Sequence, residues 1–193
     1  MRRMILAVAM LSVSAPVAAA DPRAVSPDGR RAAMIVDTGV GLDDGTGGQQ
    51  LVIEDRRSGT KRRLLTSRYD GDSHRNLTNM TGPLFSLDGG FLYVSTSDAA
   101  PTSGAVHWID LKTGAIRFVV GGTALAVIRT GPYRGYLLVQ QHRYYDRPEG
   151  GSYNPVAAIR PDGQVALIVP GSEVDDGERA ASPWLAKNGW RAS

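Results

Sequence analysis

A cluster of polar and aromatic side chains follows the apolar strand predicted at 136–139. Within one residue the chain changes from Leu and Val to hydrogen-bonding, cationic and aromatic types, namely Gln140, His142, Arg143, Tyr144 and Tyr145. In an extended strand alternate side chains share a face, so the histidine is expected beside Tyr144 and the arginine beside Tyr145. Nearby loops add Tyr133, Tyr153 and Asn154. A rigid strand end with a cation and aromatic rings is typical of a binding site. A hydrogen-bond cluster between neighbouring sheets is the structural alternative.

Five cations around one predicted turn form a second candidate site: Arg56, Arg57, Lys61, Arg62 and Arg63. Such a concentration of positive charge is suited to the phosphate groups of lipopolysaccharide or of another anionic polymer of the cell envelope. The same turn borders the outermost strand of a predicted sheet, where charges prevent pairing with another chain. Both interpretations predict an exposed patch.

The sequence lacks the spacings that mark most catalytic, cofactor and metal sites. Its histidines, His74, His107 and His142, are far apart, and neither His-x-His nor His-Glu-x-x-His occurs, so we predict no metal site. A nucleophile elbow, a phosphate-binding loop and a dinucleotide fingerprint are also missing. We therefore predict no cofactor and name no catalytic residue.

The elements that must position these residues are short strands separated by glycine-containing turns. Ser-Pro-Asp-Gly at 26–29 precedes an apolar strand, and Ser-Leu-Asp-Gly at 86–89 precedes another. Each unit continues into a second hairpin, with turns at 58–59 and 113–114. Asp-Gly and Thr-Gly pairs supply the positive φ that tight hairpins need. The pattern predicts an all-β chain in which these aspartates are turn residues.

Three repeated units are predicted along the chain. The first covers about 23–66, the second about 82–121, and the third begins at Thr123 with 131–135 in place of the opening Asp-Gly turn. Strands of the third unit are expected at 124–129, 135–141, 155–159 and 165–169. Connecting loops are expected at 69–80, 145–152 and 171–181.

This repeated phrase resembles the repeats of TolB-like β-propellers. The unit at 26–66 fits, including its closing Leu-Leu-Thr at 64–66, and the unit at 86–120 fits closely. The resemblance implies a partial or small β-propeller-like array of four-stranded antiparallel meanders, to which a β-sandwich is the alternative. It also implies a periplasmic scaffold that binds proteins, peptides or envelope components, and it implies no catalytic residues.

Closure of such a ring is a separate question, because three units are fewer than the roughly four to eight blades that usually close a propeller. Either the tail at 182–190 begins a further element, or the sheets form an incomplete ring. In the second case another chain completes it, for example a second copy in a homo-oligomer.

The first twenty residues are typical of a signal peptide. Arg2 and Arg3 precede an apolar run at 4–13, and alanines at 18–20 supply a cleavage site. A run of about ten apolar residues is too short to span a bilayer, so we expect export to the periplasm or the medium without stable membrane insertion. The chain has no cysteine, which excludes disulfides and a lipid-modified cysteine.

Residues 21–193 are expected to form one domain. The full chain has a net charge of +3, and the signal peptide contributes two of its cations and no acidic residue, so no nucleic-acid binding is predicted. The sequence thus predicts an exported binding or scaffold protein for an envelope protein, peptide or anionic polymer. The alternative is an envelope hydrolase or a lactonase-like enzyme with its site at the centre of the blades.

Overall fold

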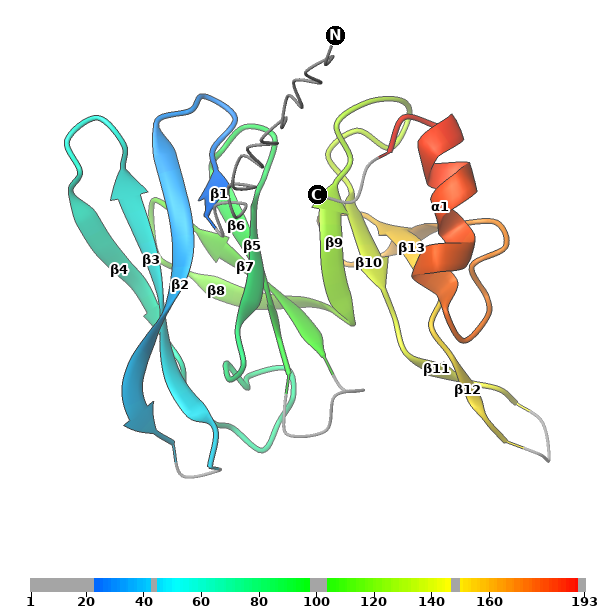
Figure 1. Cartoon of the computed structure of the whole chain (residues 1–193), viewed down its shortest axis with the longest axis horizontal. Coiled ribbons are helices and arrows are strands. Elements are labelled where there is room, and N and C mark those ends of the chain that lie inside the picture. The colour runs from blue at the N-terminus through cyan, green and yellow to red at the C-terminus, as the bar shows by residue number, and fades with distance from the viewer. Residues whose placement is uncertain (1–22, 43–44, 98–103, 147–149, 191–193) are drawn as a thin grey trace, which may run out of the picture.

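The computed structural model describes residues 23–42, 45–97, 104–146 and 150–190, in which three four-stranded antiparallel sheets stand side by side (Figure 1). Blade 1 comprises β1 (Ala24–Val25), β2 (Arg31–Gly41), β3 (Gly47–Asp55) and β4 (Lys61–Thr66). Blade 2 comprises β5 (Thr81–Phe85), β6 (Phe91–Thr96), β7 (Ala105–Asp110) and β8 (Ile116–Gly121). Blade 3 comprises β9 (Thr123–Val127), β10 (Leu137–Gln140), β13 (Val156–Ile159) and β14 (Val165–Ile168). A hairpin of β11 (Arg143–Tyr144) and β12 (Ser152–Tyr153) extends blade 3, and α1 spans Gly177–Lys187. The predicted all-β class and four-stranded meanders are confirmed.

The two Asp-Gly turns contain the same hydrogen-bond network. Ser26 Oγ donates to Asp28 Oδ1 at 2.6 Å and accepts from the first backbone N–H of β2 at 2.9 Å. Ser86 Oγ donates to Asp88 Oδ1 at 2.6 Å and accepts from the first N–H of β6 at 3.0 Å. The serine hydroxyl is the main reason why the pKa of each aspartate lies below its ordinary value. This geometry agrees with the predicted role of both aspartates as turn residues.

Apolar side chains at alternate strand positions fill the spaces between the blades. The cluster between blades 1 and 2 includes Leu51, Ile53, Leu92, Val94 and Ile109. The cluster between blades 2 and 3 includes Tyr93, Val106, Leu137, Val139 and Ile159. Each blade therefore buries its face against the next one.

The far face of blade 3 is covered by α1. Ala181 and Leu185 of the helix, with Trp190 beyond its end, pack in one cluster with Leu138 and Val156 of the sheet. The loop expected at 171–181 is therefore partly wrong, since its last residues form the first turns of a helix that begins after the N-cap Asp176. Of the tail at 182–190, residues 182–187 form the last turns of this helix and do not begin an element of their own, and completion of the ring by another chain stays a prediction.

Connections between strands alternate between two edges of the blades. The turn edge carries the tight turns, including 26–30, 55–60, 86–90, 110–115 and 160–164. The loop edge carries the connections at the other end of the strands, and we define it by residues 38–42, 67–80, 104, 121–122, 141–146 and 150–155 (Figure 1). The first candidate site lies at the loop edge and the second at the turn edge.

Candidate functional site

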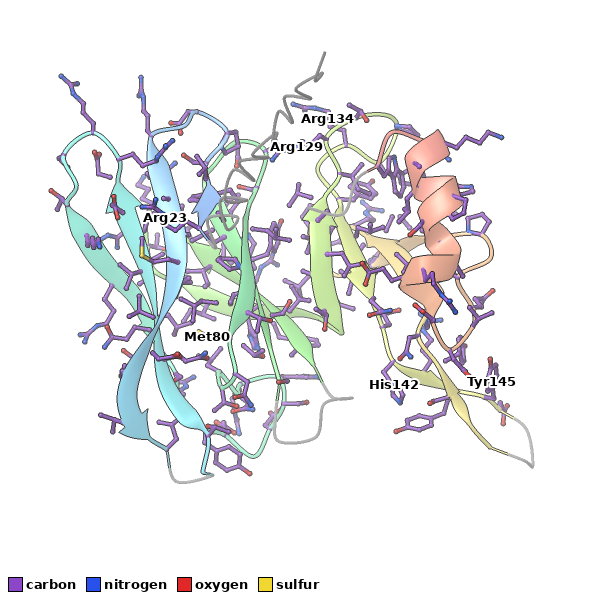
Figure 2. The ribbon with its side chains drawn as sticks, viewed as in Figure 1. Arg23, Met80, Arg129, Arg134, His142 and Tyr145 are labelled. Carbon is purple, nitrogen blue, oxygen red and sulfur yellow. The ribbon has the colours of Figure 1, made fainter. Side chains whose placement is uncertain are left out.

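The structure places the predicted polar cluster on and beside the β11–β12 hairpin (Figure 2). Gln140 ends β10 and pairs with Thr123 and Val156, so it belongs to the blade itself. Arg143 and Tyr144 form β11, with His142 before them and Tyr145 after. The Tyr144 side chain is 73% exposed. The polar cluster therefore lies on a separate hairpin that projects from the blade.

The two faces of this hairpin carry different side chains, as strand alternation predicts. The His142 ring meets the Tyr144 ring edge-on, with centroids 4.9 Å apart. Tyr145 stacks on Tyr153 of the neighbouring strand, with centroids 4.6 Å apart and ring planes 21° apart. Arg143 is opposite Tyr153 in the strand register. Stacked tyrosines thus brace the hairpin on one face and leave Tyr144 open to solvent on the other.

Asn154 holds the His142 ring in one tautomer. Asn154 Nδ2 donates to the backbone carbonyl of Asp175 at 2.7 Å, which turns its Oδ1 toward His142. This oxygen lies 2.8 Å from His142 Nδ1, so Nδ1 carries the proton and Nε2 presents a lone pair. Within the described ranges no hydrogen bond reaches Nε2. The ring therefore offers an acceptor to a ligand.

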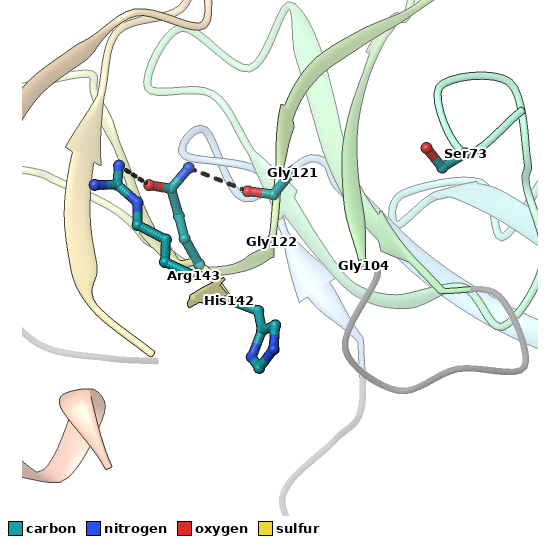
Figure 3. Close-up of a pocket in the computed structure, with 7 residues that line it drawn as sticks. Ser73, Gly104, Gly121, Gly122, His142 and Arg143 are labelled. Carbon is teal, nitrogen blue, oxygen red and sulfur yellow. Dashed lines mark hydrogen bonds between the residues drawn. The ribbon is translucent and has the colours of Figure 1, made fainter. Parts of the chain in front are cut away.

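Gln141 fixes the side chain of Arg143. Its Nε2 donates to the carbonyl oxygen of Gly121 at 3.3 Å, and its Oε1 accepts from a terminal nitrogen of the guanidinium at 2.7 Å (Figure 3). The relay ties the end of β8 in blade 2 to the hairpin of blade 3. A guanidinium has five N–H donors, so most of them stay available for a ligand.

A pocket of about 290 Å³ opens beside the hairpin, lined by Ser73, Gly104, Gly121, Gly122, Gln141, His142 and Arg143 (Figure 3). Gly122 is needed as a glycine because the chain passes closely between blades 2 and 3, and a Cβ at this position would lie 2.3 Å from the Gln140 carbonyl oxygen. Arg143 supplies the positive charge of the lining, and none of the lining residues that the structure describes is a carboxylate. The pocket is therefore suited to a neutral or anionic group.

The cationic patch lies at the turn edge, and structural contacts involve three of its five side chains. Arg56 donates to the Gly29 carbonyl at 3.0 Å, and Arg62 donates to the Leu111 carbonyl of blade 2 at 3.1 Å. Lys61 forms an ion pair with Glu54 at 3.7 Å. The other two patch residues, Arg57 and Arg63, are exposed. The structure thus separates the patch from the hairpin, and a ligand role for the patch stays a prediction.

The three histidines lie in different surroundings. His107 is 1% exposed, and its Nε2 lies 3.1 Å from Thr96 Oγ1. Burial lowers the pKa of His107 to about 4. His74 stacks on Phe118, with ring centroids 3.9 Å apart. Only His142 therefore belongs to the pocket, and the residues that the structure describes contain no group of three metal-binding side chains.

Comparison with known proteins identifies the fold and nothing finer. No family model and no curated protein matches this sequence. The β-propeller domain of the trilobed protease from Pyrococcus furiosus is 14% identical and superposes with a TM-score of 0.51, covering 77% of this chain and 41% of that one. An acylaminoacyl peptidase from Pyrococcus horikoshii is 13% identical with a TM-score of 0.52, covering 77% of this chain and 24% of that one.

TolB from Acinetobacter baumannii is 14% identical and covers 74% of this chain and 30% of that one, but its TM-score of 0.47 is too low to support an argument. The chain spans only 24% to 41% of the length of these three structures. The three meanders and the two matches with TM-scores of 0.51 and 0.52 show a β-propeller fold, as the repeat pattern implied.

Proposed function

Because the chain has the β-propeller fold and its three most exposed large apolar side chains lie along one edge, we propose that it is an exported binding module of the cell envelope. The module holds a protein, a peptide or a polymer at the loop edge. The apolar run and cleavage pattern of residues 1–20 support export, although they lie outside the described residues. Within the described residues no helix is long and apolar enough to cross a membrane.

One observation carries this proposal. Among the large apolar side chains in the described ranges, the three highest exposed fractions belong to Tyr144 at 73%, Val40 at 65% and Tyr69 at 52%. They come from the hairpin, the end of β2 and the loop between β4 and β5, which all lie at the loop edge. An extended partner that lies along this edge would reach exposed side chains of all three elements, and tyrosine and arginine are enriched where binding energy concentrates.

The surroundings of the pocket favour binding over the hydrolase alternative. A histidine base in a hydrolase is usually oriented by a third group and faces a nucleophile within hydrogen-bond reach. His142 is oriented by Asn154, but no hydrogen bond links its ring to Ser73, the hydroxyl of the lining. The peptidase activities named for the matched structures belong to proteins of which this chain spans a small part, and we do not carry them over.

The test compares loop-edge variants with a matched control. Tyr144→Ser and Tyr69→Ser each remove an exposed ring at the loop edge, and Val165→Ser removes an exposed side chain, 45% accessible, from β14. Each protein is immobilised, and the proteins and polymers that it retains from an envelope extract are quantified. The loop-edge variants should retain about tenfold less of the same component, because hot-spot tyrosines contribute more than about 1 kcal/mol each.

The control should retain it as the wild type does, with all melting temperatures unchanged. Equal retention by all four proteins would contradict the proposal, as would a loss confined to Val165→Ser.

A further inference from the structure

We propose that Arg143 anchors a carboxylate of the bound partner, so that the loop edge recognises an acidic protein segment. This inference rests on the proposed binding function and names the chemistry of its ligand.

Arg143 differs from the other arginines whose side-chain contacts are described, because its acceptor is a neutral side chain at the pocket. Arg75 and Arg179 form ion pairs with aspartates of their own loops, at 3.2 and 2.9 Å. Arg31 and Arg117 donate to backbone carbonyls of the next blade, at 2.7 and 3.0 Å. In the described part of the chain, Arg143 bonds to the neutral Gln141 amide alone. Its positive charge therefore has no acidic partner there.

The Gln141 relay is a second, independent observation. A free arginine side chain loses rotamer entropy when it binds, and this cost reduces affinity. The bond that the guanidinium donates to Gln141 Oε1 already restricts the arginine, and the bond that Gln141 donates to the Gly121 carbonyl restricts the amide in turn. An arginine that is held in this way is suited to a planar, bidentate carboxylate.

The other side of the strand favours a peptide as the source of the carboxylate. His142 and Arg143 leave the chain in opposite directions (Figure 3), so an acceptor nitrogen and a cation flank the same strand. A peptide carries both acidic side chains and backbone N–H donors, and an extended one advances about 3.3 Å per residue, so it can reach both groups. The exposed Tyr144 ring beside His142 adds the aromatic contact that peptide sites commonly use.

A membrane surface fits this edge less well. Binding to anionic lipid requires several clustered cations. The five-cation patch of this chain lies at the opposite edge. In the loop at 67–80, which belongs to the loop edge, Asp70 and Asp72 form ion pairs with Arg75. The charge distribution therefore supports a single carboxylate contact at the loop edge.

The experiment selects peptides from a displayed library of random twelve-residue sequences against the immobilised wild-type protein. Selected peptides should carry Asp or Glu at one fixed position. They should bind Arg143→Gln about 10- to 100-fold more weakly, as expected for loss of a charge-assisted hydrogen-bonded pair. Arg143→Lys should fall between the two, because it keeps the charge and loses the fork. The control is Arg134→Gln, an exposed arginine at the opposite end of the blades (Figure 2).

A double-mutant cycle decides whether Arg143 and the acidic residue contact each other. Replacing the selected Asp by Asn should weaken binding to the wild type by the same factor and should have little further effect on Arg143→Gln. Additive losses, or selected peptides without a fixed acidic position, would overturn the carboxylate inference. The binding function would survive in that case if Tyr144→Ser still abolished peptide binding. Failure to select any peptide that depends on Tyr144 would count against both.

A vesicle arm separates lipid phosphate from peptide carboxylate. Vesicles of phosphatidylglycerol and phosphatidylcholine, mixed at about one to three, should bind neither the wild type nor Arg143→Gln, because binding to anionic lipid requires several clustered cations and the loop edge offers a single one at this position. Vesicle binding that is lost in Arg143→Gln and kept in Arg134→Gln would assign the cation to a headgroup and overturn the proposal.

Discussion

At the scale of single residues, His107 couples the stability of the fold to pH. The ring is 1% exposed at the interface of blades 1 and 2, and burial lowers its pKa to about 4. In the unfolded chain the pKa of histidine is about 6.5. Between these values the unfolded chain binds a proton that the folded chain does not bind. The free energy of unfolding therefore decreases as the pH falls from about 6.5 to about 4, and this contribution is constant above that window.

Replacement of His107 by Gln should remove this dependence while keeping a polar group near Thr96. The wild type should lose up to about 3 kcal/mol more than His107→Gln between pH 7 and pH 4, since each unit of pKa difference corresponds to about 1.4 kcal/mol. Urea titrations of both proteins at several pH values measure this difference. The turn aspartates are present in both proteins, so their contribution to the pH dependence is removed by the subtraction. Parallel pH profiles for the two proteins would show that His107 does not titrate in this way.

Residue types and strand alternation predicted which side chains at 142–145 share a face, but neither the β11–β12 hairpin nor the site around it. The pairing of His142 with Tyr144 follows from their spacing along one strand. The hydrogen bond from His142 to Asn154 depends on how β11 and β12 return toward the blade. Ser73 and Gly104 reach the pocket from other connections, and no local pattern marks them. A site assembled from loops of two blades is therefore visible only in part from one sequence.

At the scale of elements, an arginine in the outermost strand of each of the first two blades reaches the next blade. Arg62 of β4 donates to the Leu111 carbonyl, and Arg117 of β8 donates to the Pro161 carbonyl at 3.0 Å. The two arginines occupy equivalent positions, opposite Ile53 and Trp108 in their sheets. Their acceptors are equivalent too, because each begins the turn between the last two strands. This repeated contact gives Arg62 a structural role within the cationic patch.

Arg62→Gln should therefore destabilise the fold more than Arg63→Gln, although the two residues are neighbours on β4. A hydrogen bond from a charged donor contributes about 1.5 to 3 kcal/mol when well formed, and we expect about 1 kcal/mol for Arg62 because its side chain is largely exposed. Arg63 is exposed and makes no hydrogen bond or ion pair within the described ranges, so its change should be near zero. Thermal unfolding of the two variants measures the contrast, and equal losses would contradict the structural role.

The short helix shows where pattern reasoning failed at this scale. Residues 177–187 contain Gly177, Ser182 and Pro183, which favour turns and loops, and only three helix residues are buried. A proline in the helix interior removes a backbone hydrogen bond and disfavours a helix. The sheet behind α1 overrides these local preferences, because Ala181 and Leu185 cover apolar side chains of blade 3. Strands of the third blade were predicted within about two residues, since their apolar runs are bounded by clear turns.

At the scale of the whole molecule, α1 closes one end of the array. Leu185 is 4% exposed and packs against the far face of blade 3. Leu185→Ala should lower the free energy of unfolding by about 3 kcal/mol, within the range for buried leucines. Lys187→Ala, at an exposed position on the same helix, is the matched control. Urea unfolding measures both, and a small effect of Leu185→Ala would mean that the helix does not hold the face of the sheet.

The same cover restricts how a second copy could pack on the array. Because α1 occupies the far face of blade 3, a ring that includes this end must pack against the helix and not directly against the sheet. Ring completion by a homo-oligomer stays a prediction, and the mass of the particle in solution tests it.

The arginine contact and the helix make the two ends of the array different. Arg62 and Arg117 reach forward along the chain, but β14 of blade 3 is Val-Ala-Leu-Ile and has no arginine to reach a following blade. At the other end, the carbonyl of Arg56 is the counterpart of the acceptors at Leu111 and Pro161, and no described blade precedes it. The arginine contact therefore has a polarity. A further blade could repeat it only ahead of blade 1, where an arginine on its own outermost strand would reach the Arg56 carbonyl.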